Sequence, residues 1–460
     1  MSPAEVQPQI EEAIKNRRFA AVRPLLSGWE PADLADLIGR LEPEDRAVLF
    51  RLLPRDVAAS TFEYLTPELQ EEVLKALGHE HVAEILNGMS PDDRTALLEE
   101  LPASVTRELI SILTPEERAV AKTLLGYPED SIGRLMTPEY IAVRPEWSVD
   151  QALAHIRRYG HDSETLNVIY VVDEGGKLID DLRMRQVLLA QPEARISDIA
   201  DGHFVSLKAT DDQEGAVQAF SEYDRVALPV TDSTGSLLGI VTIDDMLDVA
   251  EEEATEDIQK IGGMEALDEP YLKTRFAQMV RKRAGWLIVL FFGQMLTAGA
   301  LDYFRAEIAT ALILVMFLPL IISSGGNSGS QAATLVIRAM SLGEVEGAHW
   351  WSVVRREAVS GLALGLIVGA VGFLWVGAIA LFHPENYAEH WPLLGLTVAL
   401  SLVGVVLWGT LIGSTLPFVM QLVGADPATS STPFVATVVD VTGLVIYFTI
   451  AALVLRGTLL

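Results

Sequence analysis

One carboxylate lies in the middle of an apolar segment near the end of the chain. Asp440 is the only charged residue from Pro427 to Leu455 and belongs to the stretch PFVATVVDVTGLVIYF. A segment of that length can span a bilayer, which needs roughly 20 residues. A carboxylate inside it costs about 2.5–3.5 kcal/mol, and Asp440 lies roughly 10 Å beyond Pro433, too deep for its short side chain to reach water. We therefore predict that Asp440 contacts a cation.

A second apolar segment is interrupted by small and polar residues. After Pro319 the chain reads LIISSGGNSGSQ, which includes Gly325, Gly326, Asn327 and Gln331. Irregular or polar backbone at membrane depth is tolerated where it lines a wet cavity or is buried in protein. The pattern predicts a broken helix whose Asn327 and Gln331 line a pore. Close packing of helices through small residues is the alternative.

Charge is distributed unevenly along the 460 residues. The net charge is −29, of which residues 1–283 carry −25 (54 acidic, 29 basic) and residues 284–460 carry −4 (9 acidic, 5 basic). An acidic soluble region thus precedes a nearly uncharged membrane region. Such an acidic region does not suit nucleic acid, whose phosphates require a basic surface, but it suits multivalent cations. Cysteine is absent, which excludes disulfides and thiolate metal sites.

Residues 1–130 contain a repeat built around prolines. Similar phrases recur at equal intervals, at Pro43, Pro67, Pro91 and Pro115, each with Glu, Ser or Thr before it and acids after it. This arrangement is typical of helix starts with proline at the first position. We predict stacked pairs of short helices forming an all-α superhelical domain. Asp92 and Asp93 either complement a helix dipole or bind metal.

Residues 131–250 contain a second repeat. Ile169–Leu188 aligns without gaps to Leu228–Leu247, and each copy reads as strand, turn, strand and helix start after an amphipathic helix. The pattern resembles a tandem pair of α/β CBS modules. In such modules a Thr-x-x-Asp often contacts an adenosine ribose, which implies an ATP site at Thr242 and Asp245. Plain helix capping is the alternative.

Residues 251–280 are expected to connect these modules to the membrane. More than half of the residues in the run Asp244–Asp257 are acidic. On a helix, like charges at i, i+3 and i+4 repel unless cations lie among them. We predict a cation-sensing connecting helix, with a solubilising linker as the alternative.

Residues 281–460 contain five candidate spans, which are Ala284–Leu301, Ile308–Ile322, Ala358–Phe382, Trp391–Pro417 and Pro433–Leu455. Arg281, Lys282 and Arg283 precede the first span, and Arg338, Arg355 and Arg356 lie between the second and third. By the positive-inside rule the N-terminus is cytoplasmic, the C-terminus is outside and the loop with Asp426 is cytoplasmic. The N-terminus also lacks the apolar core of a signal peptide.

This order of parts resembles the MgtE family of bacterial magnesium channels over essentially the whole chain, most specifically in GGNSGSQ and PFVATVVDVTGLVIYF. The resemblance implies a homodimer that imports Mg²⁺ down its gradient, recognises hydrated Mg²⁺ at Asp440 and is closed by intracellular Mg²⁺. It implies pore-lining roles for Pro433, Ala436, Thr437 and Thr432, although Thr432 replaces the family's Asn. The implied sensor carboxylates are Asp212, Glu214, Asp224, Asp245, Asp248, Glu253, Glu256, Asp257 and Asp426, together with Asp92 and Asp93.

Two other functions fit parts of the sequence. An ion-coupled divalent cation transporter would share this architecture but would need a second titratable residue in the membrane. A membrane-anchored nucleotide sensor would leave Asp440 and GGNSGSQ without a task. An enzyme is disfavoured because the sequence has no phosphate-binding loop, nucleophilic serine elbow or His-rich metal motif.

Overall fold

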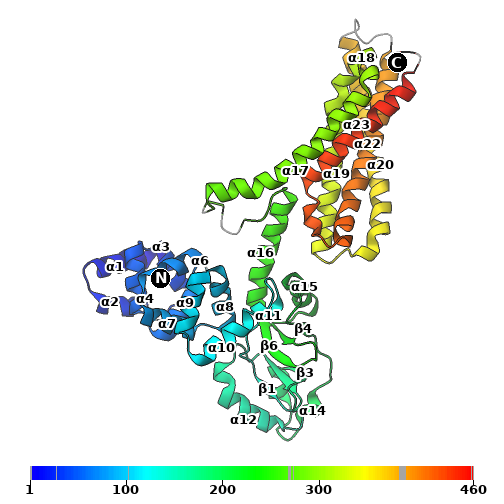
Figure 1. The fold of residues 1–460 in the computed structure, drawn as a ribbon. Coiled ribbons are helices and arrows are strands. Elements are labelled where there is room, and N and C mark those ends of the chain that lie inside the picture. Colours follow the sequence, from blue (N-terminus) through cyan, green and yellow to red (C-terminus); the bar gives the residue numbers. More distant parts are fainter. Residues whose placement is uncertain are drawn as a thin grey trace. The chain divides into compact units, whose positions relative to one another are not determined.

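The computed structural model describes residues 3–26, 28–101, 103–267, 271–272, 274–382, 390–456 and 458 (Figure 1). The chain divides into two compact units, Met1–Ala250 and Glu251–Leu460. The boundary between them falls inside a single helix, α16 (Ile243–Ile261). It lies next to the predicted end of the CBS region at residue 250, and the finer division into four domains stays a prediction.

The first unit begins with short helices packed on one another. They are α1 (Pro3–Lys15), α2 (Phe19–Leu26), α3 (Pro31–Arg40), α4 (Pro43–Leu52), α5 (Arg55–Glu63), α6 (Pro67–Ala76), α7 (His79–Gly88), α8 (Pro91–Glu100), α9 (Ala103–Ile112) and α10 (Pro115–Leu124). The helices α4, α6, α8 and α10 each begin at the predicted proline. Proline suits this position because its fixed φ is helical and its missing N–H has no intrahelical partner there. One core of buried apolar side chains runs through the repeats from Val6 to Ala121.

Two small α/β modules follow. The first contains α11 (Ile132–Leu135), β1 (Ala142–Val143), α12 (Val149–Tyr159), η1 (Gly160–Asp162), β2 (Val168–Val172), β3 (Leu178–Arg183), α13 (Met184–Leu189) and α14 (Ile196–Ile199). The second contains β4 (Leu207–Lys208), α15 (Gln213–Tyr223), β5 (Ala227–Thr231), β6 (Leu237–Thr242) and the start of α16.

The sheets of the two modules have the same topology. Their strand orders are β1-β2-β3 and β4-β5-β6, with the first pair parallel and the second antiparallel in each. The bounds of β5 and β6 are those of β2 and β3 displaced along the chain by the spacing of the sequence repeat. Bridges between Thr137 and Ile240 and between Lys177 and Ser236 join the two modules. The predicted tandem α/β fold is confirmed.

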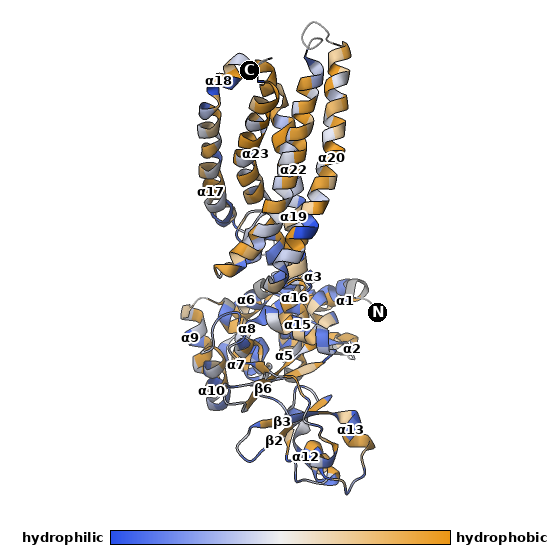
Figure 2. Cartoon of the chain, turned by 90° about the vertical axis from the view of Figure 1, so that its right-hand side faces the viewer, coloured by the Kyte–Doolittle hydropathy of each residue, from blue (hydrophilic) through white to orange (hydrophobic). Residues whose placement is uncertain are grey.

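The second unit contains five helices that are long and apolar enough to cross a membrane, counted over the described residues. Its elements are α17 (Phe276–Tyr303), α18 (Arg305–Thr310), η2 (Leu312–Phe317), α19 (Leu318–Ser341), η3 (Gly347–His349), α20 (Trp350–Phe382), α22 (Trp391–Leu422), η4 (Pro427–Thr429) and α23 (Thr432–Val454). Figure 2 shows hydrophobic residues along all five long helices. The predicted number of spans is confirmed, but the second span is Leu312–Ser341 rather than Ile308–Ile322.

The predicted break at GGNSGSQ does not occur, because α19 is one helix from Leu318 to Ser341. Its glycines instead allow close packing against α22. A Cβ on Gly329 would lie 2.8 Å from the carbonyl oxygen of Gly409, and a Cβ on Gly325 would collide with Val405. Small residues let membrane helices approach until their backbones touch. The irregular backbone lies earlier in the second span, in the 3₁₀ helix η2.

Candidate functional site

Asp440 lies half-buried on α23, beside both α17 and α19. A Cβ on Gly326 of α19 would lie 3.9 Å from Oδ1 of Asp440, so the two membrane motifs meet at this carboxylate. From α17, Gln294 forms a side-chain hydrogen bond with Asp440. Sequence reasoning missed Gln294, although an amide inside the apolar run LIVLFFGQMLTAG was a usable signal. The arrangement gives Asp440 one amide partner and leaves part of its carboxylate open.

A stripe of polar side chains runs along α19 next to this site. Ser323, Asn327 and Gln331 follow one another at four-residue spacing and are all exposed on the single chain. The Asn327 amide Nδ2 donates to the Ser323 hydroxyl at 3.4 Å. Amides left facing hydrocarbon would lack hydrogen-bond partners at a cost of several kcal/mol each, on the order given by transfer data. This face of α19 therefore suits water or another protein surface.

The first turns of α23 lie between α17 and α19. The Thr432 carbonyl accepts a hydrogen bond from Ser330 Oγ at 3.3 Å. A Cβ on Gly293 of α17 would lie 2.9 Å from Thr437 Cγ2, and a Cβ on Gly326 would lie 3.6 Å from the Ala436 side chain. Thr432, Pro433, Ala436 and Thr437 are all partly exposed. Their pore-lining role stays a prediction, as does that of Gly325, Gly326, Asn327 and Gln331.

A cluster of carboxylates lies in the first unit, where α8 and the start of α16 approach each other. Asp92 is 7% exposed, and its Oδ1 has no hydrogen-bond partner among the described residues. Ser90 Oγ donates to Asp93 at 2.6 Å, and Thr242 Oγ1 donates to Asp245 at 2.7 Å. Burial, followed by the charges of Asp245 and Asp93, raises the pKa of Asp92. Burial also raises the pKa of Asp245 to about 7.

This acidic cluster also contains acids that sequence reasoning did not select. Burial raises the pKa of Glu63 to about 7, against the lowering effect of a hydrogen bond from the Ser90 N–H. Burial and then the charges of Asp244 and Asp93 raise the pKa of Glu164, and burial followed by neighbouring acids raises that of Glu139. These residues come from distant parts of the chain, so no local pattern could reveal them. Like charges gathered at this place raise one another's pKa values, and Arg94 offsets this only in part at Glu139.

The predicted sensor carboxylates at the two ends of α15 do not join this cluster within one chain, whereas Asp248 lies at its edge. Asp212 caps the start of α15 and accepts a hydrogen bond from the Glu214 N–H at 3.0 Å. Asp224 follows the last residue of the same helix, in a left-handed conformation with φ 49°. The 11 residues of α15 separate these ends by roughly 16 Å. Asp248 is exposed on α16, near enough to Asp93 to raise its pKa, after the larger effect of burial.

The last turns of α16 carry the remaining predicted carboxylates. Lys260 Nζ contacts Glu256 at 2.5 Å and Asp426, in the loop before α23, at 2.6 Å. Burial lowers the pKa of Lys260, but the hydrogen bonds with these two carboxylates outweigh it and raise the pKa overall. Asp257 accepts a hydrogen bond from Ser341 at the end of α19 at 2.6 Å. Glu253 lies one turn earlier on α16 and is partly exposed.

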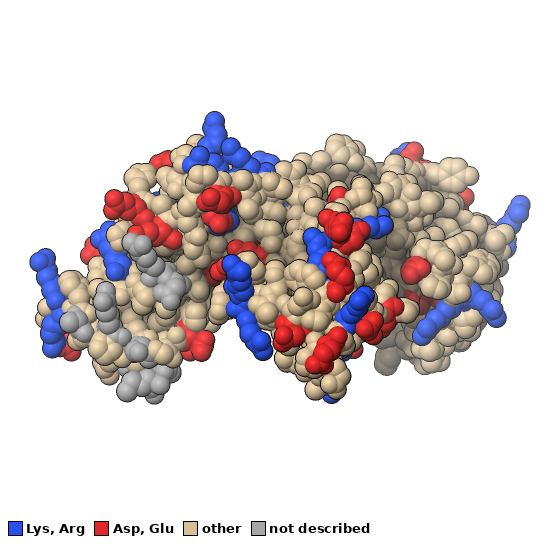
Figure 3. All heavy atoms as spheres, turned by 90° about the horizontal axis from the view of Figure 1, so that it is seen from below, with Lys and Arg blue, Asp and Glu red and all other residues tan. Residues whose placement is uncertain are grey.

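No group of three or more His, Asp or Glu within the described ranges is placed to hold a metal ion. The metal-ligand assignments therefore stay predictions. Thr242 is 6% exposed and its hydroxyl is bonded to Asp245, so the predicted ribose-contacting pair is engaged in a local contact. Figure 3 shows acidic and basic side chains interspersed on the face that it presents, which gives nucleic acid no continuous basic track there.

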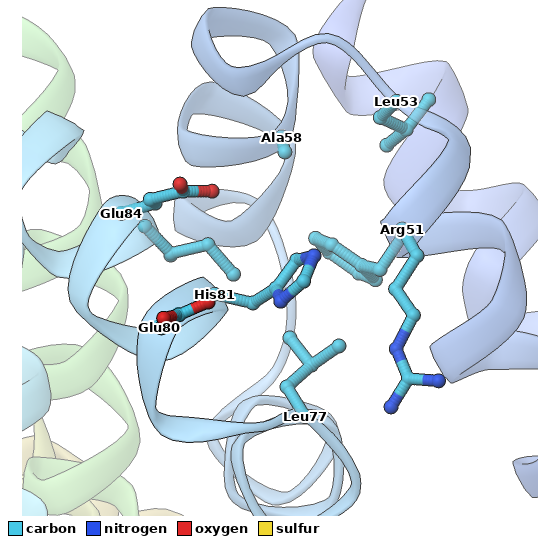
Figure 4. A pocket seen from close by; sticks show the side chains of 9 residues that line it. Arg51, Leu53, Ala58, Leu77, Glu80, His81 and Glu84 are labelled. Carbon is cyan, nitrogen blue, oxygen red and sulfur yellow. The ribbon is translucent and has the colours of Figure 1, made fainter.

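A pocket of about 370 Å³ lies among the helical repeats (Figure 4). Figure 4 shows the His81 ring pointing into it between Leu77 and Arg51, with Glu80 and Glu84 on the same helix. Its lining combines acidic and basic side chains, which favours neither cations nor anions. The pocket shares no residue with the acidic cluster or with the surroundings of Asp440.

Comparisons with known proteins agree along the chain. The family models that match are the MgtE intracellular N domain at residues 29–130, the CBS domain at 132–193 and 196–252, and the MgtE divalent cation transporter domain at 318–450. The magnesium transporter MgtE of Thermus thermophilus is 39% identical over 97% of this chain and 98% of its own length. The magnesium transporter MgtE of Enterococcus faecalis is 33% identical over 97% of this chain and 96% of its own length.

Solved structures also match, and two of them cover about half of the chain. One is the cytosolic domain of the Mg²⁺ channel MgtE in complex with ATP, 39% identical, with a TM-score of 0.51 over 53% of this chain and 99% of that one. The other is the soluble part of a magnesium transporter, which is 29% identical. Its TM-score is 0.52, and the match covers 55% of this chain and 100% of that one. With full-length relatives above 30% identity and an ordered set of matching domains, the chain belongs to the MgtE family of multi-pass membrane divalent cation transporters.

Proposed function

We propose that this protein is a Mg²⁺-selective channel that imports Mg²⁺ down its electrochemical gradient and is closed by intracellular Mg²⁺. The observation that carries the proposal is the half-buried Asp440 beside the polar stripe Ser323, Asn327 and Gln331. Mg²⁺ gives up its water reluctantly and prefers six oxygen ligands. A carboxylate flanked by amides and hydroxyls can bind the ion through its retained water.

The pore forms between two copies of the chain in this proposal. One chain supplies one carboxylate in the middle of its spans, and its polar stripe is exposed at membrane depth. A two-fold dimer would pair two Asp440 carboxylates and bring two stripes around one wet path. That arrangement would also remove the cost of leaving amides in contact with lipid.

Closure is assigned to the soluble carboxylates. In the absence of cations, Asp92, Asp93 and Asp245 repel one another in a partly buried place. Mg²⁺ bound there stabilises the contact between the helical repeats and the start of α16, and therefore favours the closed state by its differential affinity. Asp212, Glu214, Asp224, Asp248, Glu253, Glu256, Asp257 and Asp426 are proposed to take part in the same sensing, and ATP is proposed to bind the CBS modules. ATP binding is supported by the ATP complex of a 39% identical cytosolic domain.

The proposed topology places the N-terminus in the cytoplasm and the C-terminus outside. The cytoplasmic side is supported by Arg281, Lys282 and Arg283 before the first span and by Arg338, Arg355 and Arg356 between the second and third.

The test is Mg²⁺ uptake into proteoliposomes, followed with an internal Mg²⁺-sensitive dye. Asp440→Asn keeps the side-chain volume but removes the charge. We expect uptake to fall at least about 100-fold, because an ion in the pore loses several kcal/mol of stabilisation when the carboxylate is neutralised. Thr449→Val is the matched control on α23, because Thr449 is exposed and, among the described residues, its hydroxyl donates to its own helix at Val445. Unchanged uptake by Asp440→Asn would refute the proposal.

An ion-coupled transporter is distinguished in the same vesicles. The channel predicts that uptake follows only the Mg²⁺ gradient and the membrane potential. Uptake that tracks an imposed proton or sodium gradient at constant potential would favour the coupled mechanism.

A further inference from the structure

Three carboxylates converge on one ammonium at the end of the connecting helix. Lys260 Nζ lies 2.5 Å from Glu256 Oε1 on its own helix and 2.6 Å from Asp426 Oδ2 in the loop before α23. Asp257 lies on the adjacent position of α16 and interacts electrostatically with both Asp426 and Lys260. One positive charge therefore faces three negative charges, which leaves a local charge of −2.

The ion pair with Asp426 joins segments that are distant in the sequence. Glu256 is four residues from Lys260, which alone would be an ordinary pair on a helix surface, but Asp426 is 166 residues away. The second oxygen of Asp426 accepts from the Ala428 N–H at 2.8 Å and caps η4, so the carboxylate is fixed in the loop. The side chains of Lys260, Glu256 and Asp426 are only 24%, 35% and 35% exposed.

The same end of α16 contacts the start of the helix that carries Asp440. A Cβ on Gly263 would lie 3.1 Å from Pro433 Cγ and 3.0 Å from the Trp286 ring. Gly263 has φ +77°, which only glycine adopts without strain, so this turn can lie directly against Pro433. Trp286 Nε1 also donates to Ser431 Oγ at 3.0 Å. The pair between Lys260 and Asp426 therefore lies where movement of α16 would reach the proposed mouth of the pore.

We propose that the ammonium of Lys260 takes the place of a bound cation and holds the end of α16 on the loop before α23. This contact favours the closed state even without Mg²⁺. The inference rests on the proposed function. A divalent ion bound near Glu256, Asp257 and Asp426 neutralises the remaining charge of −2 and adds to the hold that Lys260 provides. Lys260 thereby reduces the range over which internal Mg²⁺ controls conduction.

The test uses the full chain in proteoliposomes with internal Mg²⁺ set by a chelator. Lys260→Gln removes the ammonium and keeps a long polar side chain. We expect uptake at zero internal Mg²⁺ to rise on the order of five-fold, because the closed state loses the stabilisation of one partly exposed ion pair. Inhibition at millimolar internal Mg²⁺ should persist, so the ratio of the two uptake rates should increase. Lys260→Arg should restore wild-type behaviour.

Two further variants keep the result interpretable. Lys122→Gln changes an exposed lysine on α10 and should leave both rates unchanged. Asp426→Asn removes the charge of the partner that lies outside α16 and should give a similar rise, which tests the same contact if Lys260→Gln does not fold. Uptake by folded Lys260→Gln that equals wild type at zero internal Mg²⁺, or that is lost at every Mg²⁺ level, would overturn the proposal. A wild-type protein without Mg²⁺-inhibited uptake would instead refute the proposed function.

Discussion

The two units use carboxylates in opposite ways. The first unit gathers several of them around Asp92, where burial and mutual repulsion raise their pKa values. The second unit places a single carboxylate, Asp440, in the middle of its spans and surrounds it with an amide, a glycine and a polar helix stripe. In the proposed function, the crowded carboxylates depend on bound cations, whereas the solitary one is a place that a cation can enter and leave.

Under the proposed function, this difference separates the residue that selects the ion from the residues that control conduction. Conduction requires binding that is weak enough for the ion to leave, which one carboxylate per chain and retained water can provide. A sensor requires a large free-energy change between states, and several repelling charges provide that. The predictions below test each half of this comparison.

The largest effect on stability is expected where the membrane helices touch. Gly329→Ala places a Cβ 2.8 Å from the carbonyl oxygen of Gly409, and both backbones resist displacement. We expect the membrane unit to lose about 1–3 kcal/mol of stability, which is the usual cost of overpacking, and uptake to fall. Gly299→Ala is the control because, apart from the local backbone of α17, no described atom lies within 4 Å of its Cβ position. Equal melting temperatures in detergent for the two variants would show that α19 does not need this glycine for packing.

The next effect concerns the amide beside Asp440. Gln294→Leu removes the hydrogen bond to the carboxylate and should reduce uptake by about ten-fold, since bonds to charged groups contribute about 1.5–3 kcal/mol. Met295→Leu changes the exposed neighbouring residue of α17 and should not alter uptake. If both variants transport at the wild-type rate, Gln294 does not position Asp440.

A smaller effect is expected in the acidic cluster. Asp92→Asn removes a buried charge with an unpartnered oxygen and should raise the melting temperature in Mg²⁺-free buffer by about 2–4 °C. The further rise on adding Mg²⁺ should become smaller. Glu44→Gln, at the equivalent position in the first turn of α4, is exposed and should produce no increase. A lower Mg²⁺-free melting temperature for Asp92→Asn would indicate a structural role for its charge.

The smallest effect is a dependence on pH. The pKa values of Asp245 and Glu63 are raised to about 7, well above those of an unfolded chain. A raised carboxyl pKa contributes stability that is present at low pH and is lost as pH rises through about 7. The Mg²⁺-free protein should therefore melt at a higher temperature at pH 6 than at pH 8. The difference should shrink in the double variant Asp92→Asn/Asp245→Asn, and an unchanged difference would assign the dependence to other groups.

Much of the fold could be predicted because its signals are periodic. The proline spacing located the helices that begin at Pro43, Pro67, Pro91 and Pro115, and the second sequence repeat located the paired sheets. The number of spans followed from long apolar runs. The break predicted in α19 was wrong because glycine has two uses that look alike in a sequence, irregular backbone and close helix contact. The unbroken helix and contacts such as that of Gly329 with Gly409 distinguish them.

The site was predictable only where a single residue conflicts with its surroundings. Asp440 stands out as a charge in an apolar span, whereas Glu63, Glu139 and Glu164 resemble ordinary surface acids in the sequence. Their raised pKa values arise from tertiary contacts between helical repeats, the first CBS module and the start of α16. Lys260 was similarly hidden, because its partner Asp426 lies 166 residues away.

The central claim is that conduction and closure depend on different carboxylates. The most direct measurement is Mg²⁺ uptake into proteoliposomes at zero and at millimolar internal Mg²⁺ for wild type, Asp440→Asn and Asp92→Asn. We predict that Asp440→Asn abolishes uptake at both levels, whereas Asp92→Asn still transports but shows a smaller ratio between the two levels. Wild-type uptake by Asp440→Asn, or an unchanged ratio in Asp92→Asn, would contradict this division.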